Sequence, residues 1–183
     1  MSDVQSLAGS SRPPGAVAAR TGLWLALSAW VGSWLCFALV VAPLAFRVLP
    51  SAEVAGSLVS PSLALLHVSG AVAAVIVAAL GAGLGRGKVA IGLPLVLAAL
   101  TLASEYGVTP QLADLRNAAF GPDGNVEAAA AYRRLHGISM SLFSVVLLGA
   151  LFLVGWHARL DTPKDSGPDT PNHAGSGPPQ EAR

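Results

Sequence analysis

The chain has 183 residues, of which 53% are hydrophobic and only 11% are charged. Charged residues make up about a quarter of a typical soluble domain, so this composition indicates a membrane protein. The formal net charge of +1 gives no electrostatic basis for binding nucleic acid. The single cysteine, Cys36, excludes an intramolecular disulfide and any paired-cysteine metal motif.

The first 21 residues are mostly small and polar and include two prolines, Pro13 and Pro14. Such a segment cannot bury enough apolar surface to offset the loss of chain entropy, so we predict a disordered tail over residues 1–21. The apolar run that follows is longer than the roughly 7–15 residues of a signal peptide, and no small-residue cleavage site follows it. A retained membrane helix is therefore the better interpretation.

The first membrane span is expected at about residues 23–46, a run without charge. About 24 helical residues at 1.5 Å each cross a hydrocarbon core of about 30 Å. Small residues recur every four positions at Ser28, Gly32 and Cys36, and such a stripe lets helices pack closely in lipid. Pro43 is expected to kink or end the helix. A neighbouring bulky stripe is either core or lipid-facing surface: Trp30, Trp34, Phe37 and Val41.

The second span is expected at about residues 58–84, with Pro61 in its first turn, where a missing N–H costs little. This span has a small-residue stripe of its own: Gly70, Ala74, Ala78 and Ala82. His67 interrupts the apolar run. Helical spacing places His67 on the side of the small-residue stripe, so it should face the bundle and not the lipid.

The third span is expected at about residues 89–107. Its strictly apolar part, residues 89–103, would cover only about 22 Å as a helix. We therefore expect Glu105 to be drawn into the bundle or the interface. Residues 110–120 have apolar side chains at helical spacing, which predicts a short amphipathic helix on the membrane surface. The sequence GPDG at residues 121–124 then predicts a turn.

The fourth span is expected at about residues 135–156, and three residues form its small face: Gly137, Ser141 and Ser144. From residue 161 to 183 the chain is again rich in Pro, Gly, Ser, Asp and Thr, which predicts a second disordered tail. The sequence therefore predicts an all-α fold. One integral membrane four-helix bundle occupies residues 22–160, between disordered N- and C-terminal tails.

Four spans place both tails on the same side of the membrane. Basic residues near the spans favour that side as the inner one by six to four. We therefore expect a multi-pass protein of the bacterial inner (plasma) membrane with both tails in the cytoplasm. Its expected partner is the lipid bilayer, a homo-oligomer is left open, and no nucleic-acid partner is expected.

Several short motifs occur in a characteristic order: WVG at residues 30–32, APLAF at 42–46, His67, PQLADLR at 110–116, and LHGIS at 135–139. With these motifs the chain, from about residue 23 to 156, resembles the transmembrane protein 205-like family. That family is a four-span membrane domain of unknown function found in bacteria and eukaryotes. The resemblance implies a fold and a location, but no activity.

Ionisable residues inside a membrane are costly, so each one is a candidate for function. The topology gathers four of them in or near the outer half of the bundle, as a candidate polar pocket: Arg47, His67, Glu105 and His136. The plainer interpretations are a hydrogen-bonded core histidine for His67 and an interfacial histidine for His136. Arg47 is most simply a headgroup anchor. We expect Glu105 to pair with His67 or Arg47.

No metalloprotease, serine-hydrolase or nucleotide-binding motif occurs, and no pair of carboxylates lies in the spans. We therefore expect a non-enzymatic membrane protein without a cofactor or metal. Two alternatives stay open. One is a redox protein in which His67 and His136 bind haem or copper, because four-helix bundles build such sites from facing histidines. The other is proton-coupled transport of a small solute through Glu105 and the histidines, which would need an oligomer.

Overall fold

The computed structural model describes residues 14–121 and 124–162, and no strand occurs within these ranges. The elements in order are α1 (Pro14–Cys36), the π-helical η2 (Phe37–Val41), α2 (Ala42–Val48), α3 (Ala52–Gly83), α4 (Gly87–Ala103), the π-helical η3 (Ser104–Val108), α5 (Thr109–Phe120) and α6 (Val126–Asp161). They join into four continuous rods, each long and apolar enough to cross a membrane. The predicted all-α fold with four membrane helices is confirmed.

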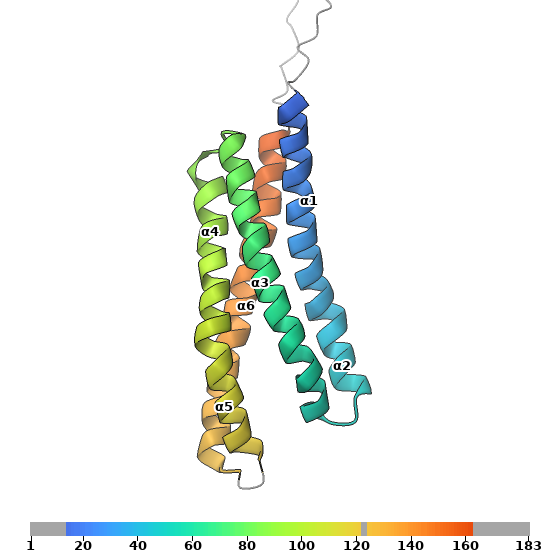
Figure 1. Ribbon diagram of the computed structural model, residues 1–183, viewed down its shortest axis with the longest axis vertical. Helices are drawn as coiled ribbons and strands as arrows, with labels where there is room; N and C mark the ends of the chain where they lie inside the picture. Colours follow the sequence, from blue (N-terminus) through green and yellow to red (C-terminus); the bar gives the residue numbers. More distant parts are fainter. Residues whose placement is uncertain (1–13, 122–123, 163–183) are drawn as a thin grey trace, which may run out of the picture.

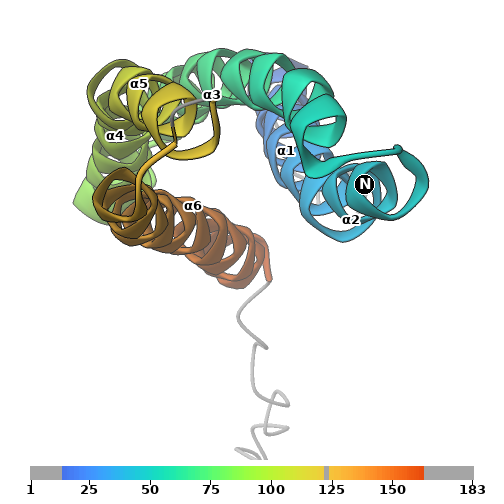
Figure 2. The same ribbon diagram turned by 90° about the horizontal axis from the view of Figure 1, so that it is seen from below.

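The four rods run antiparallel (Figure 1). The start of α1, the turn between α3 and α4 and the end of α6 lie at one end, here called the tail end. The connections after α2 and after α5 lie at the opposite end, the loop end. Seen from below, the rods form an open arc in the order α1, α3, α4, α6 (Figure 2). The helix α3 packs against both α1 and α4, while α6 packs against α4 and α5.

Two helices begin earlier than predicted. Residues 14–21, assigned above to the tail, are the first turns of α1, with Pro14 as the first helical residue. Proline is suited to that position, and the alanines that follow are strong helix formers. The helix α3 begins at Ala52, because the Ser51 side chain caps it by accepting a hydrogen bond from the Val54 N–H. Pro61 therefore lies inside the helix, and the prediction that placed it in the first turn was wrong.

The remainder of the predicted tails, residues 1–13 and 163–183, lies outside the described residues. The same holds for residues 122–123, the centre of the predicted turn. The flanking Gly124 N–H donates to the Gly121 carbonyl at 3.0 Å. The chain therefore reverses direction between α5 and α6, where the sequence predicts it.

Two proline residues are accommodated by π-helical turns. In the first rod the N–H of Ala42 donates to the Phe37 carbonyl, and in the third the N–H of Thr109 donates to the Ser104 carbonyl. Pro43 and Pro110 follow directly, and a proline ring clashes with the carbonyl four residues before it. The wider π-helical spacing relieves this clash without ending the helix. Pro43 therefore leaves the rod continuous to the end of α2.

The helix predicted at residues 110–120 exists as α5, but its expected position was wrong. It continues directly from α4 through η3 and packs against α6, so it is not a separate surface helix (Figure 1). The π-helical turn explains the difference, because it lets the third rod pass Pro110 without a break.

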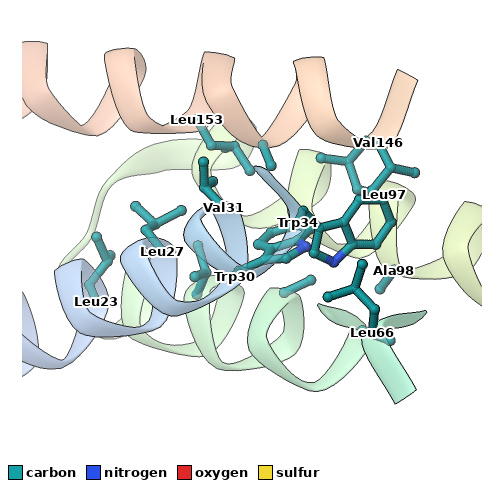
Figure 3. Packing of buried hydrophobic residues seen from close by; sticks show 14 residues of the cluster. Leu23, Leu27, Trp30, Val31, Trp34, Leu66, Leu97, Ala98, Val146 and Leu153 are labelled. Carbon is teal, nitrogen blue, oxygen red and sulfur yellow. The ribbon is translucent and has the colours of Figure 1, made fainter. Parts of the chain in front are cut away.

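The core is built where bulky side chains of α1 meet small ones of α3 (Figure 3). The buried cluster combines residues from all four rods: Leu23, Leu27, Trp30, Val31, Trp34, Leu66, Ala71, Ala74, Val77, Leu97, Ala98, Val146, Ala150 and Leu153. On α3 the predicted packing face is confirmed at three of its four positions, since Gly70, Ala74 and Ala78 are buried and Ala82 is exposed.

On α1 the prediction of the packing face was wrong. The small residues Ser28, Gly32 and Cys36 are exposed, whereas the bulky Trp30 and Trp34 are buried. The small face of the fourth span is exposed as well: Gly137, Ser141 and Ser144. The physical reason is complementarity, because close packing needs a small face on only one of two partners, and large rings bury the most apolar area. The α3 helix already provides the small face.

Candidate functional site

His67 and Glu105 form a buried pair in the apolar bundle. The His67 Nδ1 lies 2.8 Å from the Glu105 Oε2, and the two side chains are only 3% and 14% exposed. The histidine comes from the middle of α3, and the carboxylate from the beginning of η3. The expectation that Glu105 has a basic partner is confirmed, and that partner is His67.

Glu105 reaches this position from a π-helical turn. The apolar α4 ends at Ala103, and η3 begins with the buried Ser104. An additional residue per turn rotates the side chains that follow, and such turns are frequent at functional sites. Without a partner, a carboxylate at this depth would be strongly destabilising. The π-helical turn of the third rod therefore brings Glu105 to His67, and His67 provides the partner that the Glu105 carboxylate needs at this buried position.

A group of aromatic rings packs beside His67. The ring centroid of Trp34 lies 5.7 Å from that of His67, and Trp34 stacks on Phe143 with centroids 4.6 Å apart. Phe37 tilts against Phe143 at 6.3 Å. All four rods therefore meet here, with Trp34 on α1 and Phe143 on α6. The sequence indicated Trp34 and Phe37 only as members of a bulky stripe and gave no reason to choose Phe143.

The other two candidate residues lie elsewhere. Arg47 is exposed near the end of α2, and His136 is exposed on α6, where its ring stacks on Tyr132 with centroids 5.8 Å apart. Within the described ranges, no hydrogen bond or ion pair links either residue to His67 or Glu105. His136 precedes Phe143 by seven residues on the same helix, which corresponds to about 10 Å. The structure thus brings together two of the four candidates.

A second polar cluster lies at the tail end, and the sequence did not indicate it. The Arg86 Nη2 lies 2.6 Å from the Asp161 Oδ1, and the Trp24 indole N–H donates to the Asp161 Oδ2 at 2.9 Å. The Arg20 Nε lies 3.7 Å from Asp161. The cluster joins the first rod, the turn between α3 and α4, and the end of α6.

The turn between α3 and α4 brings Arg86 into this cluster. Gly85 and Gly87 on either side have φ angles of 64° and 82°, which favour glycine. The guanidinium also donates to the Nδ1 of the fully buried His157 at 2.9 Å. Because guanidinium only donates, this ring nitrogen accepts, and His157 is neutral with its proton on Nε2. The position of Arg86 between two glycines of a short turn could have indicated this cluster. The sequence analysis used Arg86 only as one of the basic residues that set the membrane orientation.

Among the residues that the structure describes, no three side chains of His, Cys, Asp or Glu come together in a way that could hold a metal ion. The polar groups of the His67–Glu105 pair are one imidazole and one carboxylate, which can share a proton and exchange hydrogen bonds with a bound solute.

A family profile described as "Domain of unknown function (DUF4149)" matches residues 25–120, more than half of the chain. The chain belongs to the DUF4149 family. No curated protein and no solved structure matches it. The DUF4149 match contains both His67 and Glu105 but ends before α6, so Phe143 and Asp161 lie outside it.

Proposed function

We propose that this DUF4149 protein is a non-enzymatic integral membrane protein that binds a small polar solute in a pocket at the His67–Glu105 pair. The observation that carries the proposal is the 2.8 Å contact of these two groups inside the apolar bundle. Replacing a buried ion pair with apolar residues is often neutral or stabilising. Stability alone therefore does not account for the pair, and ionisable groups within a membrane commonly mark ligand or proton sites.

We propose the inner membrane of a bacterium as its location, with both tails in the cytoplasm, and a relationship to the transmembrane protein 205-like family. The six-to-four basic bias and the short basic turn with Arg86 and Lys88 support this orientation. Reporter fusions after Gly121 and after Asp161 are expected to report opposite sides of the membrane, with the Asp161 fusion inside. An inside signal at Gly121 would contradict the orientation.

Proton-coupled transport of the solute is the second candidate. It is favoured by one observation, namely that the His67 imidazole and the Glu105 carboxylate lie close enough to share a proton. Four spans make a small transporter, so this function calls for a homo-oligomer. The outward-facing Ser28, Gly32 and Cys36 on α1 support such an assembly, since small residues allow close contact between helices.

The haem or copper alternative would need His67 and His136 at one site, but His136 is exposed and stacks on Tyr132. Protein purified from haem-replete cells is expected to show no Soret band. A strong band that disappears in both His67→Ala and His136→Ala would establish the redox alternative instead.

The proposed pocket is tested by combining stability with complementation. Glu105→Gln alone is expected to lower the melting temperature modestly, and adding His67→Leu should restore part of the loss. If the pocket binds solute, this stable double variant fails to restore the phenotype caused by deleting the gene. The exposed Glu127, at the start of α6, provides the matched control Glu127→Gln, which should complement fully. Full complementation by the double variant would refute the pocket.

A further inference from the structure

Two surface grooves follow the first rod, and one arginine lies in the wall of each. The groove near the loop end has a volume of about 170 Å³ and is lined by Leu39, Val40, Pro43, Leu44 and Arg47. The tail-end groove is larger, about 370 Å³, and its wall is a stripe of α1: Val17, Arg20, Thr21, Trp24, Leu25 and Ser28. Sites for small molecules have volumes of about 300–1,000 Å³, so only the tail-end groove reaches this range.

The two arginines are spaced to reach both surfaces of a bilayer. Arg20 and Arg47 are 27 residues apart along one continuous helical rod, which corresponds to about 40 Å. A bilayer with its headgroup regions is about 40–45 Å thick. Each groove therefore lies at the depth of the lipid headgroups. Trp24 agrees with this depth, because tryptophan is enriched where the membrane meets water.

Arg20 has donors available for a ligand in the tail-end groove. The Asp161 carboxylate already accepts from Arg86 at 2.6 Å and from the Trp24 indole at 2.9 Å. The Arg20 Nε lies 3.7 Å from this carboxylate, beyond hydrogen-bond distance, and has no hydrogen-bond partner among the described residues. The Arg20 side chain is 36% exposed. It can therefore bind another acceptor, and a guanidinium matches a phosphate group with two parallel hydrogen bonds.

The charges around the groove favour an anion. The tail end carries four basic residues and one acidic residue within the described ranges: Arg20, Arg86, Lys88, Arg159 and Asp161. None of the described residues in the groove wall is acidic, and Asp161 is bonded to Arg86 and Trp24. The ammonium group of a zwitterionic lipid would therefore lack a partner here, whereas a phosphate with an uncharged head alcohol would not need one.

We propose that the tail-end groove binds the headgroup of an anionic phospholipid whose head alcohol is uncharged, as in phosphatidylglycerol. Arg20 and Thr21 donate to the phosphate oxygens, and the glycerol backbone of the lipid lies against Leu25. The acyl chains extend from there into the bilayer beside α1. This site is separate from the His67–Glu105 pair and does not depend on the function proposed there.

Native mass spectrometry of the full chain in detergent tests the lipid preference. Phosphatidylglycerol and phosphatidylcholine with identical acyl chains are added in turn, and the share of protein that retains lipid is measured. Phosphatidylglycerol should be retained about fivefold more, which is the contribution of one basic residue at a membrane surface. Equal retention of the two lipids would overturn the proposal. Millimolar inorganic phosphate should not displace the lipid, and displacement would identify a site for free phosphate instead.

Arg20→Gln tests whether this arginine holds the headgroup. It is expected to lower the retention of phosphatidylglycerol about fivefold. Arg159→Gln is the matched control, because Arg159 is exposed in the last turn of α6 at the same end and does not line the groove. This control should change the retention by less than about twofold. Equal losses in the two variants would mean that any basic residue at this end attracts the lipid, and the groove would not be the site.

If Arg20→Gln does not fold, Leu25→Trp tests the groove without removing a charge. Leu25 is 66% exposed, so a larger ring there leaves the core unchanged and fills the groove. The retention of phosphatidylglycerol should fall to that of phosphatidylcholine. Leu65→Trp is the control, because Leu65 is exposed on α3 and lines neither groove. Unchanged retention in Leu25→Trp would refute the site.

Discussion

The tail-end cluster is partly buried and the His67–Glu105 pair is more deeply buried, and the two also differ in how many groups satisfy each carboxylate. At the tail end, Asp161 accepts from Arg86 and Trp24 and lies within 3.7 Å of Arg20. In the middle of the bundle, Glu105 has one bonded partner among residues 14–121 and 124–162, namely His67. The first arrangement ties together three distant parts of the chain, and the second leaves a carboxylate with unused acceptor capacity.

The two clusters also differ in where they lie relative to the helix ends. Arg86 interacts with the last turns of α6, where it donates to the His157 carbonyl at 3.5 Å as well as to Asp161. A positive charge at a helix C-terminus also interacts favourably with the helix dipole. The His67–Glu105 pair lies far from any helix end except the π-helical turn that carries Glu105. We therefore expect the tail-end cluster to stabilise the fold, whereas the pair is the place where we propose that a solute binds.

The largest expected effect tests the tail-end cluster. Arg86→Met leaves Asp161 and the buried His157 without their main donor. Removing one partner of a buried ion pair costs about 3–5 kcal/mol, and we expect about 3 kcal/mol because the Asp161 side chain is 22% exposed. The free energy of unfolding in detergent measures this loss.

Lys88→Met is the matched control, since Lys88 is exposed in the first turn of α4, two residues after Arg86. It should change the free energy of unfolding by less than about 0.5 kcal/mol. Equal stability of the Arg86→Met and Lys88→Met variants would show that the cluster does not hold the tail end together.

A smaller effect is expected at Trp24, which joins the first rod to the same cluster. Trp24→Phe keeps an aromatic ring but removes the 2.9 Å hydrogen bond to Asp161. A loss of about 1–2 kcal/mol is expected, because the acceptor is charged. Trp156→Phe is the control, since its indole nitrogen has no partner within the described ranges. A larger loss for Trp156→Phe than for Trp24→Phe would contradict the contribution of this hydrogen bond.

The sequence predicted the four helices and the burial of Glu105 for the same reason. Long charge-free runs determine where spans lie, and the short apolar part of the third run predicted that Glu105 is drawn into the bundle or the interface. The tail-end cluster could not be predicted in this way, because Trp24 and Asp161 are 137 positions apart and meet only after packing. The packing face of α1 also depends on its neighbour, because a small stripe and a bulky stripe are both plausible until α3 is known to supply the small partner.

The smallest expected effect concerns the pair itself. The double variant His67→Leu/Glu105→Leu removes the His67–Glu105 contact and places two apolar side chains at this site, where the Trp34 ring packs against position 67. Because apolar replacements of buried pairs are often neutral, we expect its free energy of unfolding to stay within about 1 kcal/mol of the wild type. Arg86→Met/Asp161→Leu, the corresponding change at the tail end, should still lose about 2 kcal/mol, since Trp24 and His157 remain without partners. Equal losses in the two double variants would mean that both clusters serve the fold alike. The assignment of the His67–Glu105 pair to binding would then lose its physical basis.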